Sequence, residues 1–217
     1  METDILKQMI SVIRTEEQRR ALLLTDQDQN FAYDQWLFTD EPFVNELCMM
    51  LLVTLRHQVE RELVSLAACA ADDGQEISDQ QYEEKVNQLR KNKGIGWDWG
   101  KIKDRLKLES CEGYQHTEAL RLLSNSYKHD PYMEPDKKLL ELLQLKTGVN
   151  YASLPKSDAL REGLAAFIAL GKDATYCDIA ERFVDIANDF LVTVQSRTKL
   201  SQVKRSPVSM KPSTFAH

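Results

Sequence analysis

The sequence predicts an all-α protein, a bundle of about seven helices, from the helical periodicity of its apolar residues. Three observations support this prediction. Only eight glycines and six prolines occur in 217 residues, which leaves few of the turns that connect strands. β-branched residues seldom alternate with polar ones, as they do in half-buried strands. Apolar residues instead recur three or four positions apart, the spacing of one face of a helix.

Two helices are expected in the first third of the chain. Residues 4–24 carry apolar side chains at helical spacing, and Thr3 is placed to cap their first turn. A longer helix is expected over residues 40–63, because Asp-Glu-Pro at residues 40–42 supplies a cap and a first-turn proline. This helix is the expected spine of the core. The acidic, glycine-containing stretch 71–76 is typical of an exposed loop.

Shorter helical segments are expected in the rest of the chain. Ser78 or Asp79 can cap a polar helix that ends in a basic cluster. Trp97 and Trp99 lie in a glycine-containing turn, where aromatic residues usually close the edge of a core. Pro131 ends a helix, because proline disfavours helical backbone in the residue before it. The remaining helical segments are expected near residues 102–108, 114–128, 136–145, 157–170 and 175–194.

Charge and composition exclude several classes of function. The formal net charge is −6, so the whole protein has no basic field for nucleic acid and any RNA or DNA site must be local. The longest apolar stretch, residues 47–55, is far shorter than the ~20 residues of a membrane span. The N-terminus lacks the basic-then-apolar order of a signal peptide. We therefore expect a cytoplasmic protein that has no membrane contact.

The four cysteines give no sign of a metal site or a disulfide framework. They form no CxxC pair, and no histidine lies at zinc-ligand spacing from them, so we expect reduced and mostly buried thiols. The glycines near residue 95 also lack the pattern of a phosphate loop. We expect neither a metal nor a cofactor. The cysteines are Cys48, Cys69, Cys111 and Cys177.

One domain and a tail are expected. Residues 1–196 would form a single helical domain, and residues 197–217, which are basic and contain no acidic residue, would form a flexible tail. The tail is either a solvated terminus or an electrostatic arm that touches phosphates or an acidic partner.

One predicted helix aligns three polar residues that suit phosphodiester chemistry. Arg121, Asn125 and His129 are four residues apart and share one face over two turns. A guanidinium binds phosphate bidentately, an imidazole titrates near neutral pH, and a carboxamide orients a neighbouring group. Such residues can help the 2′-OH of an RNA attack its own adjacent phosphate without a metal ion. Leu120 and Leu123, on another face, would pack into the core.

An ordinary surface helix explains the same residues. Glu118 and Arg121 have the spacing of an i,i+3 ion pair. Lys128 and His129 suit a helix C-terminus, where cations are favoured. Asn125 would then meet only solvent. Spacing alone leaves both interpretations open.

Two weaker candidates contain histidine. Arg56, His57 and Arg61 on the long helix would approach the same groove only if the two helices pack antiparallel, and adjacent charged residues on a helix usually point to solvent. His116 falls on the core side of its helix and is expected to be a buried histidine with a satisfied hydrogen bond.

A resemblance to a known family covers the middle third of the chain. The segment Ala119-Leu-Arg-Leu-Leu-Ser-Asn-Ser-Tyr-Lys-His129 resembles the signature helix of the HEPN superfamily. Residues 99–108 and Tyr114 are similar to the preceding region of some bacterial members. These proteins are helical bundles common in prokaryotic toxin–antitoxin and antiviral systems. Active members are metal-independent endoribonucleases that build their site across a homodimer.

The resemblance implies roles and partners for this chain. His129 would be the general base or acid, Arg121 the phosphate binder and Asn125 the orienting group. The implied partners are RNA, a second copy of the chain, and an antitoxin or another defence-system protein. Further residues expected to touch RNA are Tyr114, Lys128 and Arg205.

The chain departs from the family pattern at one position. In the family an arginine commonly precedes the polar residue directly, whereas here Ser124 precedes Asn125 and Arg121 lies a turn earlier. The long Arg121 side chain can still reach a shared site along its face. The departure fits equally a non-catalytic protein that keeps the bundle for dimerisation or partner docking. A third interpretation is a nucleotide pocket between helices, in which the tryptophan turn stacks a base.

Overall fold

Each part of the chain that the structure describes contains helix. A computed structural model describes residues 3–25, 41–70, 78–91, 96–129, 134–147 and 154–198. These ranges contain eight α-helices and no strand, apart from one isolated bridge between Arg90 and Trp97, so the all-α prediction is confirmed there. The elements are α1 (Thr3–Thr25), α3 (Glu41–Cys69), α4 (Asp79–Gln88), α5 (Trp99–Leu106), a 3-10 turn (Leu108–Ser110), α6 (Tyr114–His129), α7 (Lys137–Leu142), a second 3-10 turn (Leu154–Lys156), α8 (Asp158–Phe167) and α9 (Tyr176–Arg197).

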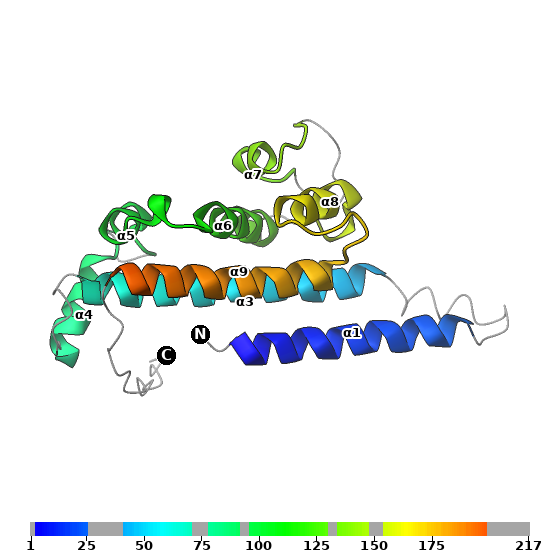
Figure 1. Cartoon of the computed structure of the whole chain (residues 1–217), viewed down its shortest axis with the longest axis horizontal. Helices are drawn as coiled ribbons and strands as arrows, with labels where there is room; N and C mark the ends of the chain where they lie inside the picture. Colours follow the sequence, from blue (N-terminus) through cyan, green and yellow to red (C-terminus); the bar gives the residue numbers. More distant parts are fainter. Residues whose placement is uncertain are drawn as a thin grey trace, which may run out of the picture.

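Two long helices, α3 and α9, form the centre of the bundle. They pack side by side, and α1 covers one side of the pair (Figure 1). On the opposite side lie α5, α6 and α8, which Figure 1 shows nearly end-on, with α7 outside them. The central helices supply many of the largest buried side chains, among them Leu55 and Phe183. The expectation that the second helix is the spine of the core is confirmed.

Capping boxes begin two of the described helices, α4 and α9. Ser78 accepts a hydrogen bond from the Gln81 backbone N–H, and the Gln81 side chain accepts one from the Ser78 backbone, which is a capping box. The predicted cap at Ser78 is therefore confirmed. Thr175 and Asp178 form a second capping box at the start of α9. The residues expected to cap α3 at its N-terminus include Asp40, which lies outside the described residues.

The helix α6 begins at a glycine turn and buries one face. Gly113 has a φ of 81°, a left-handed conformation that glycine adopts without strain, and it leads directly into α6. Leu120 and Leu123 are fully buried, as the sequence predicted. Ser124 is also buried, at 1% exposure. The polar face of α6 therefore lies at the edge of the core, beside α3.

The tryptophan turn connects α4 to α5. The backbone N–H of Asp98 donates to the Leu89 carbonyl at 2.7 Å, and the Asp98 side chain caps α5. The guanidinium of Arg90 lies over the Trp97 ring, 4.8 Å from its centroid. Arg105 of α5 donates to the carbonyl of Ala67 at the end of α3 at 3.2 Å. The first two contacts hold the turn against the end of α4, and the third ties α5 to the C-terminal end of α3.

Two residues expected in the tail lie at the end of α9, Arg197 as its last residue and Thr198 as its C-cap. Arg197, expected to begin the tail, is the last residue of α9 and donates to the Ser110 carbonyl at 2.8 Å. Residues 199–217, which hold the rest of the expected tail and Arg205, lie outside the described residues. Among the helices described, none is long and apolar enough to cross a membrane.

Candidate functional site

A pocket of about 250 Å³ lies where α3, the tryptophan turn and α6 meet, and we call it the α3–α6 pocket. It brings together α3, α6 and the segment that connects α4 to α5. Most of its lining side chains are charged or aromatic. The lining residues are Arg56 and Glu60 from α3, Lys91, Gly96, Trp97 and Trp99 from the turn and the start of α5, and Arg121, Asn125 and Lys128 from α6.

Helix periodicity explains which residues reach the pocket. Arg56 and Glu60 are four residues apart and lie one turn apart on α3. On α6, the residues that line the pocket are at positions i, i+4 and i+7, which is one narrow face. The structure therefore brings together Arg121, Asn125 and Lys128, three of the residues singled out in the sequence.

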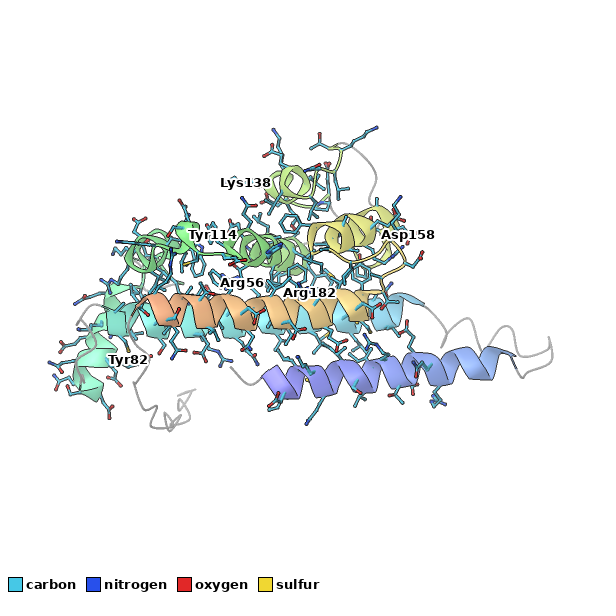
Figure 2. The ribbon with its side chains drawn as sticks, in the orientation of Figure 1. Arg56, Tyr82, Tyr114, Lys138, Asp158 and Arg182 are labelled. Carbon is cyan, nitrogen blue, oxygen red and sulfur yellow. The ribbon has the colours of Figure 1, made fainter. Side chains whose placement is uncertain are left out.

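Arg56 is the most deeply buried charge in the pocket. Only 7% of the residue is exposed, and Figure 2 shows it between the α3–α9 pair and the layer that holds α6. Its Nη1 lies 3.2 Å from Oε2 of Glu60, and its guanidinium lies 4.9 Å from the centroid of the Trp99 ring. Burial lowers the pKa of Arg56, Glu60 opposes this shift, and the positive charge of Arg121 adds to it. Two arginines thus share a small, poorly hydrated space.

Arg121 lines the pocket while it is paired with Glu118. Its Nε and Nη2 donate to the two carboxylate oxygens at 2.8 and 2.6 Å, and these hydrogen bonds raise the pKa of the guanidinium. The i,i+3 ion pair expected for an ordinary helix is therefore present. The Arg121 side chain is only 23% exposed, however, so the pair lies at the edge of the core and not on an open surface.

The pocket carries an excess of positive charge. Four cationic side chains line it, against a single carboxylate, Glu60. Glu118 lies beside the pocket and pairs with Arg121, and its inclusion still leaves an excess of two positive charges. In a protein with a net charge of −6, this is one local basic site of the kind that the composition requires for any nucleic-acid function.

Two buried donors in the lining have no hydrogen-bond acceptor among the described residues. They are Nη1 of Arg56 and Nε1 of Trp99. Nη1 of Arg56 lies at ion-pair distance, 3.2 Å, from Oε2 of Glu60, and no well-formed hydrogen bond to a described residue satisfies it. Buried donors are normally paired, and an acceptor with a negative charge would satisfy both of these.

The structure separates His129 from the pocket lining. His129 is exposed at the C-terminal end of α6, one residue beyond Lys128. Tyr114, at the opposite end of the helix, is half-buried, and burial raises the pKa of its hydroxyl. It does not belong to the lining either. Arg205 lies outside the described residues.

Of the two positions that the sequence left open for Arg56, solvent or the groove beside α6, the structure has the second. Arg56 is buried next to the stripe of Leu55 and Val59 and lines the same pocket as Arg121. His57 does remain half-exposed, with Nδ1 3.7 Å from Oε2 of Glu60. The i,i+4 spacing of Arg56 and Glu60 indicates an ion pair in the sequence, but it does not indicate that the pair lies inside a pocket.

Trp97 and Trp99 are half-buried and pack against the core, as expected, and they also line the pocket. His116, expected to be buried, is half-buried with its ring edge against Phe167, at 5.0 Å between centroids.

Ser124 occupies a position that cannot supply a cation to this pocket. It is 1% exposed, and its Oγ has no hydrogen-bond partner among the described residues. An arginine there would have to enter the core. Within α6, which is described throughout, the positive charges that line the pocket are those of Arg121 and Lys128.

Comparisons with known proteins add no family to these observations. Searches against protein-family models, curated proteins and solved structures each return no match. The resemblance of residues 119–129 to the HEPN superfamily stays a prediction from the sequence.

Proposed function

We propose that the protein is a HEPN-like RNA-binding protein that holds single-stranded RNA at the α3–α6 pocket. The observation that carries this proposal is the combination of four cations and two half-buried indoles around one pocket. Cations bind phosphates, and indoles stack on bases with little regard for sequence. The pocket is smaller than the ~300–1,000 Å³ of drug-sized ligand sites, so it suits a single nucleotide unit of a longer chain.

Cleavage of that RNA is the reaction that the HEPN resemblance implies. Arg121 would bind the phosphate, Asn125 would orient the reacting group, and His129 would take the proton of the 2′-OH. His129 lies at the exposed end of α6, where a second copy of the chain can complete the site. His57 is a second imidazole close to the pocket, since its Nδ1 lies 3.7 Å from Glu60.

A matched pair of variants tests RNA binding. Arg121 on α6 and Arg19 on α1 are each held by a glutamate three residues earlier through two hydrogen bonds. Arg121→Ala and Arg19→Ala therefore remove the same charge and the same kind of ion pair, but only the first changes the pocket. We expect Arg121→Ala to weaken RNA binding about tenfold. Arg19→Ala should leave the affinity unchanged.

Cleavage is tested separately, with a chelator present and purified RNA as substrate. If His129 is the general base, His129→Ala should lower the cleavage rate by a factor of about 10²–10⁴ while RNA binding persists. If His57→Ala has that effect instead, the base lies on α3. Absence of cleavage in the wild type, with RNA binding intact, leaves a binding protein and refutes the proposed reaction.

A non-catalytic docking protein is the second candidate, and an apolar stripe on α1 favours it. Ile5, Met9 and Val12 lie at positions i, i+4 and i+7 and are 51%, 47% and 68% exposed. This is the spacing of the apolar residues through which an amphipathic helix binds a partner. Light scattering on the wild type and on Met9→Lys would test it: unchanged mass for both, as monomers, argues against self-association.

A further inference from the structure

Arg56 and Trp99 are the cation and the indole at the inner end of the α3–α6 pocket, and the general RNA-binding role does not specify which group of the RNA they bind. Their contact is close, since the guanidinium lies 4.9 Å from the centroid of the indole ring. Each carries a buried N–H donor that has no acceptor among the described residues. The two donors belong to neighbouring groups in one pocket, so a single ligand can satisfy both.

The charge of Arg56 is compensated only in part. A buried cation is costly unless it is paired and hydrogen-bonded. Glu60 is the carboxylate nearest to Arg56, and the same oxygen, Oε2, also faces Nδ1 of His57 at 3.7 Å. The neighbouring Arg121 adds positive charge, while Glu118 is held by Arg121. The inner end of the pocket therefore favours an anion over a neutral ligand.

The donors select an oxyanion with several acceptor oxygens. Guanidinium groups match phosphate bidentately, and an indole N–H donates one hydrogen bond. Both nitrogens are shielded from solvent, so a small side-chain rotation accompanies binding, as is common at ligand sites. A phosphate offers enough oxygens to accept from Arg56 and Trp99 together. The volume of about 250 Å³ accommodates a phosphate and part of its nucleoside.

We infer that Arg56 and Trp99 form a phosphate-binding subsite at the inner end of the α3–α6 pocket. The ligand is the phosphate group of a nucleotide or of an RNA chain. This inference rests on the proposed function, because it names the group that anchors the RNA. The phosphate is either an internal phosphodiester or a terminal monoester, and both present the same oxyanion chemistry.

Three variants separate the subsite from the rest of the pocket. Arg56→Met removes the guanidinium and keeps an apolar side chain, while Arg56→Lys keeps a charge but loses the planar donor fork. Trp99→Phe removes the indole N–H and keeps an aromatic ring. Because that N–H has no partner among the described residues, its loss breaks no hydrogen bond in the free protein, and Trp99→Phe should lower stability only through lost packing and a weaker contact with Arg56. Arg19→Met on α1 is the control.

The measurement is titration calorimetry with AMP, adenosine and short RNA carrying either a 5′-phosphate or a 5′-hydroxyl. We expect AMP to bind more tightly than adenosine. Arg56→Met should weaken AMP and RNA binding about 10- to 100-fold, Trp99→Phe about three- to tenfold, and Arg56→Lys by an intermediate factor. Arg19→Met should bind as the wild type does. A preference for the 5′-phosphorylated RNA identifies a monoester, and equal affinities identify a phosphodiester.

Equal binding of AMP and adenosine, or wild-type affinity in both Arg56→Met and Trp99→Phe, would overturn the inference. The proposed function is judged by a different variant. If Arg121→Ala weakens RNA binding while the Arg56 and Trp99 variants do not, the pocket binds RNA and the subsite is wrong. If substitutions of Arg121, Arg56 and Trp99 all leave RNA binding unchanged, both proposals fail.

Discussion

Opposite charges in the α3–α6 pocket should contribute very differently to stability. Arg56 has a side chain that is 8% exposed, whereas that of Glu60 is 22% exposed. Replacing Arg56 by methionine removes a buried cation and keeps most of its apolar volume. The Glu60 carboxylate is not left without compensation, because Nδ1 of His57 still lies 3.7 Å from it and its side chain is partly exposed to solvent. The removed desolvation penalty is offset by loss of the contact with the Trp99 ring, worth about 0.5–2 kcal/mol.

Arg56→Met should therefore have a free energy of unfolding within about 1 kcal/mol of the wild type. Glu60→Gln should instead lower the free energy of unfolding, because it leaves Arg56 buried next to the charge of Arg121. Loss of one partner from a buried pair costs about 3–5 kcal/mol, and the partial exposure of Glu60 reduces this to about 2–3 kcal/mol.

Urea unfolding followed by circular dichroism measures both variants, provided that the dependence on denaturant stays constant. The expected order is Glu60→Gln well below the wild type, and Arg56→Met close to it. If Arg56→Met is destabilised as much as Glu60→Gln, the guanidinium is a structural partner of Glu60. The case for an unsatisfied cation in the pocket would then be lost.

Three further predictions concern the bundle. Thr175→Ala should lower the free energy of unfolding by about 1 kcal/mol in urea titrations, because it removes the cap of α9. Burial lowers the pKa of His57 in the folded protein, so the unfolded chain binds a proton at this residue at a higher pH than the folded chain does. The wild type should therefore lose more stability than His57→Gln when the pH falls from about 7 to about 5. Equal losses would show that His57 titrates alike in both states. Mass spectrometry after alkylation should find half-buried Cys69 modified before Cys48 and Cys177, whose sulfur atoms lie 3.1 Å apart in the core. Early labelling of Cys48 would contradict that burial.

The boundaries of the helices follow closely from local patterns. The expected span 4–24 corresponds to α1 (Thr3–Thr25), and 114–128 corresponds to α6 (Tyr114–His129). Both spans are set by apolar periodicity and by turn residues, which are local properties. The cap at Ser78, one of the two candidates with Asp79, could be predicted for the same reason.

The composition of the pocket could be predicted only in part. Arg121 and Asn125 were assigned to one face correctly, because four residues advance only about 40° around a helix. His129 is eight residues from Arg121, about 80° around, and this drift places it outside the lining. The inward turn of Arg56 depends on how α3 packs against α6, which no single-helix pattern encodes.

The most direct test of RNA binding at the α3–α6 pocket is fluorescence anisotropy of a labelled single-stranded RNA with Arg121→Ala and Arg19→Ala. Both variants lose one arginine and one i,i+3 pair with glutamate, so their net charges are equal. Binding at the pocket predicts a dissociation constant about tenfold higher for Arg121→Ala and unchanged for Arg19→Ala. Equal dissociation constants for the two variants would contradict it.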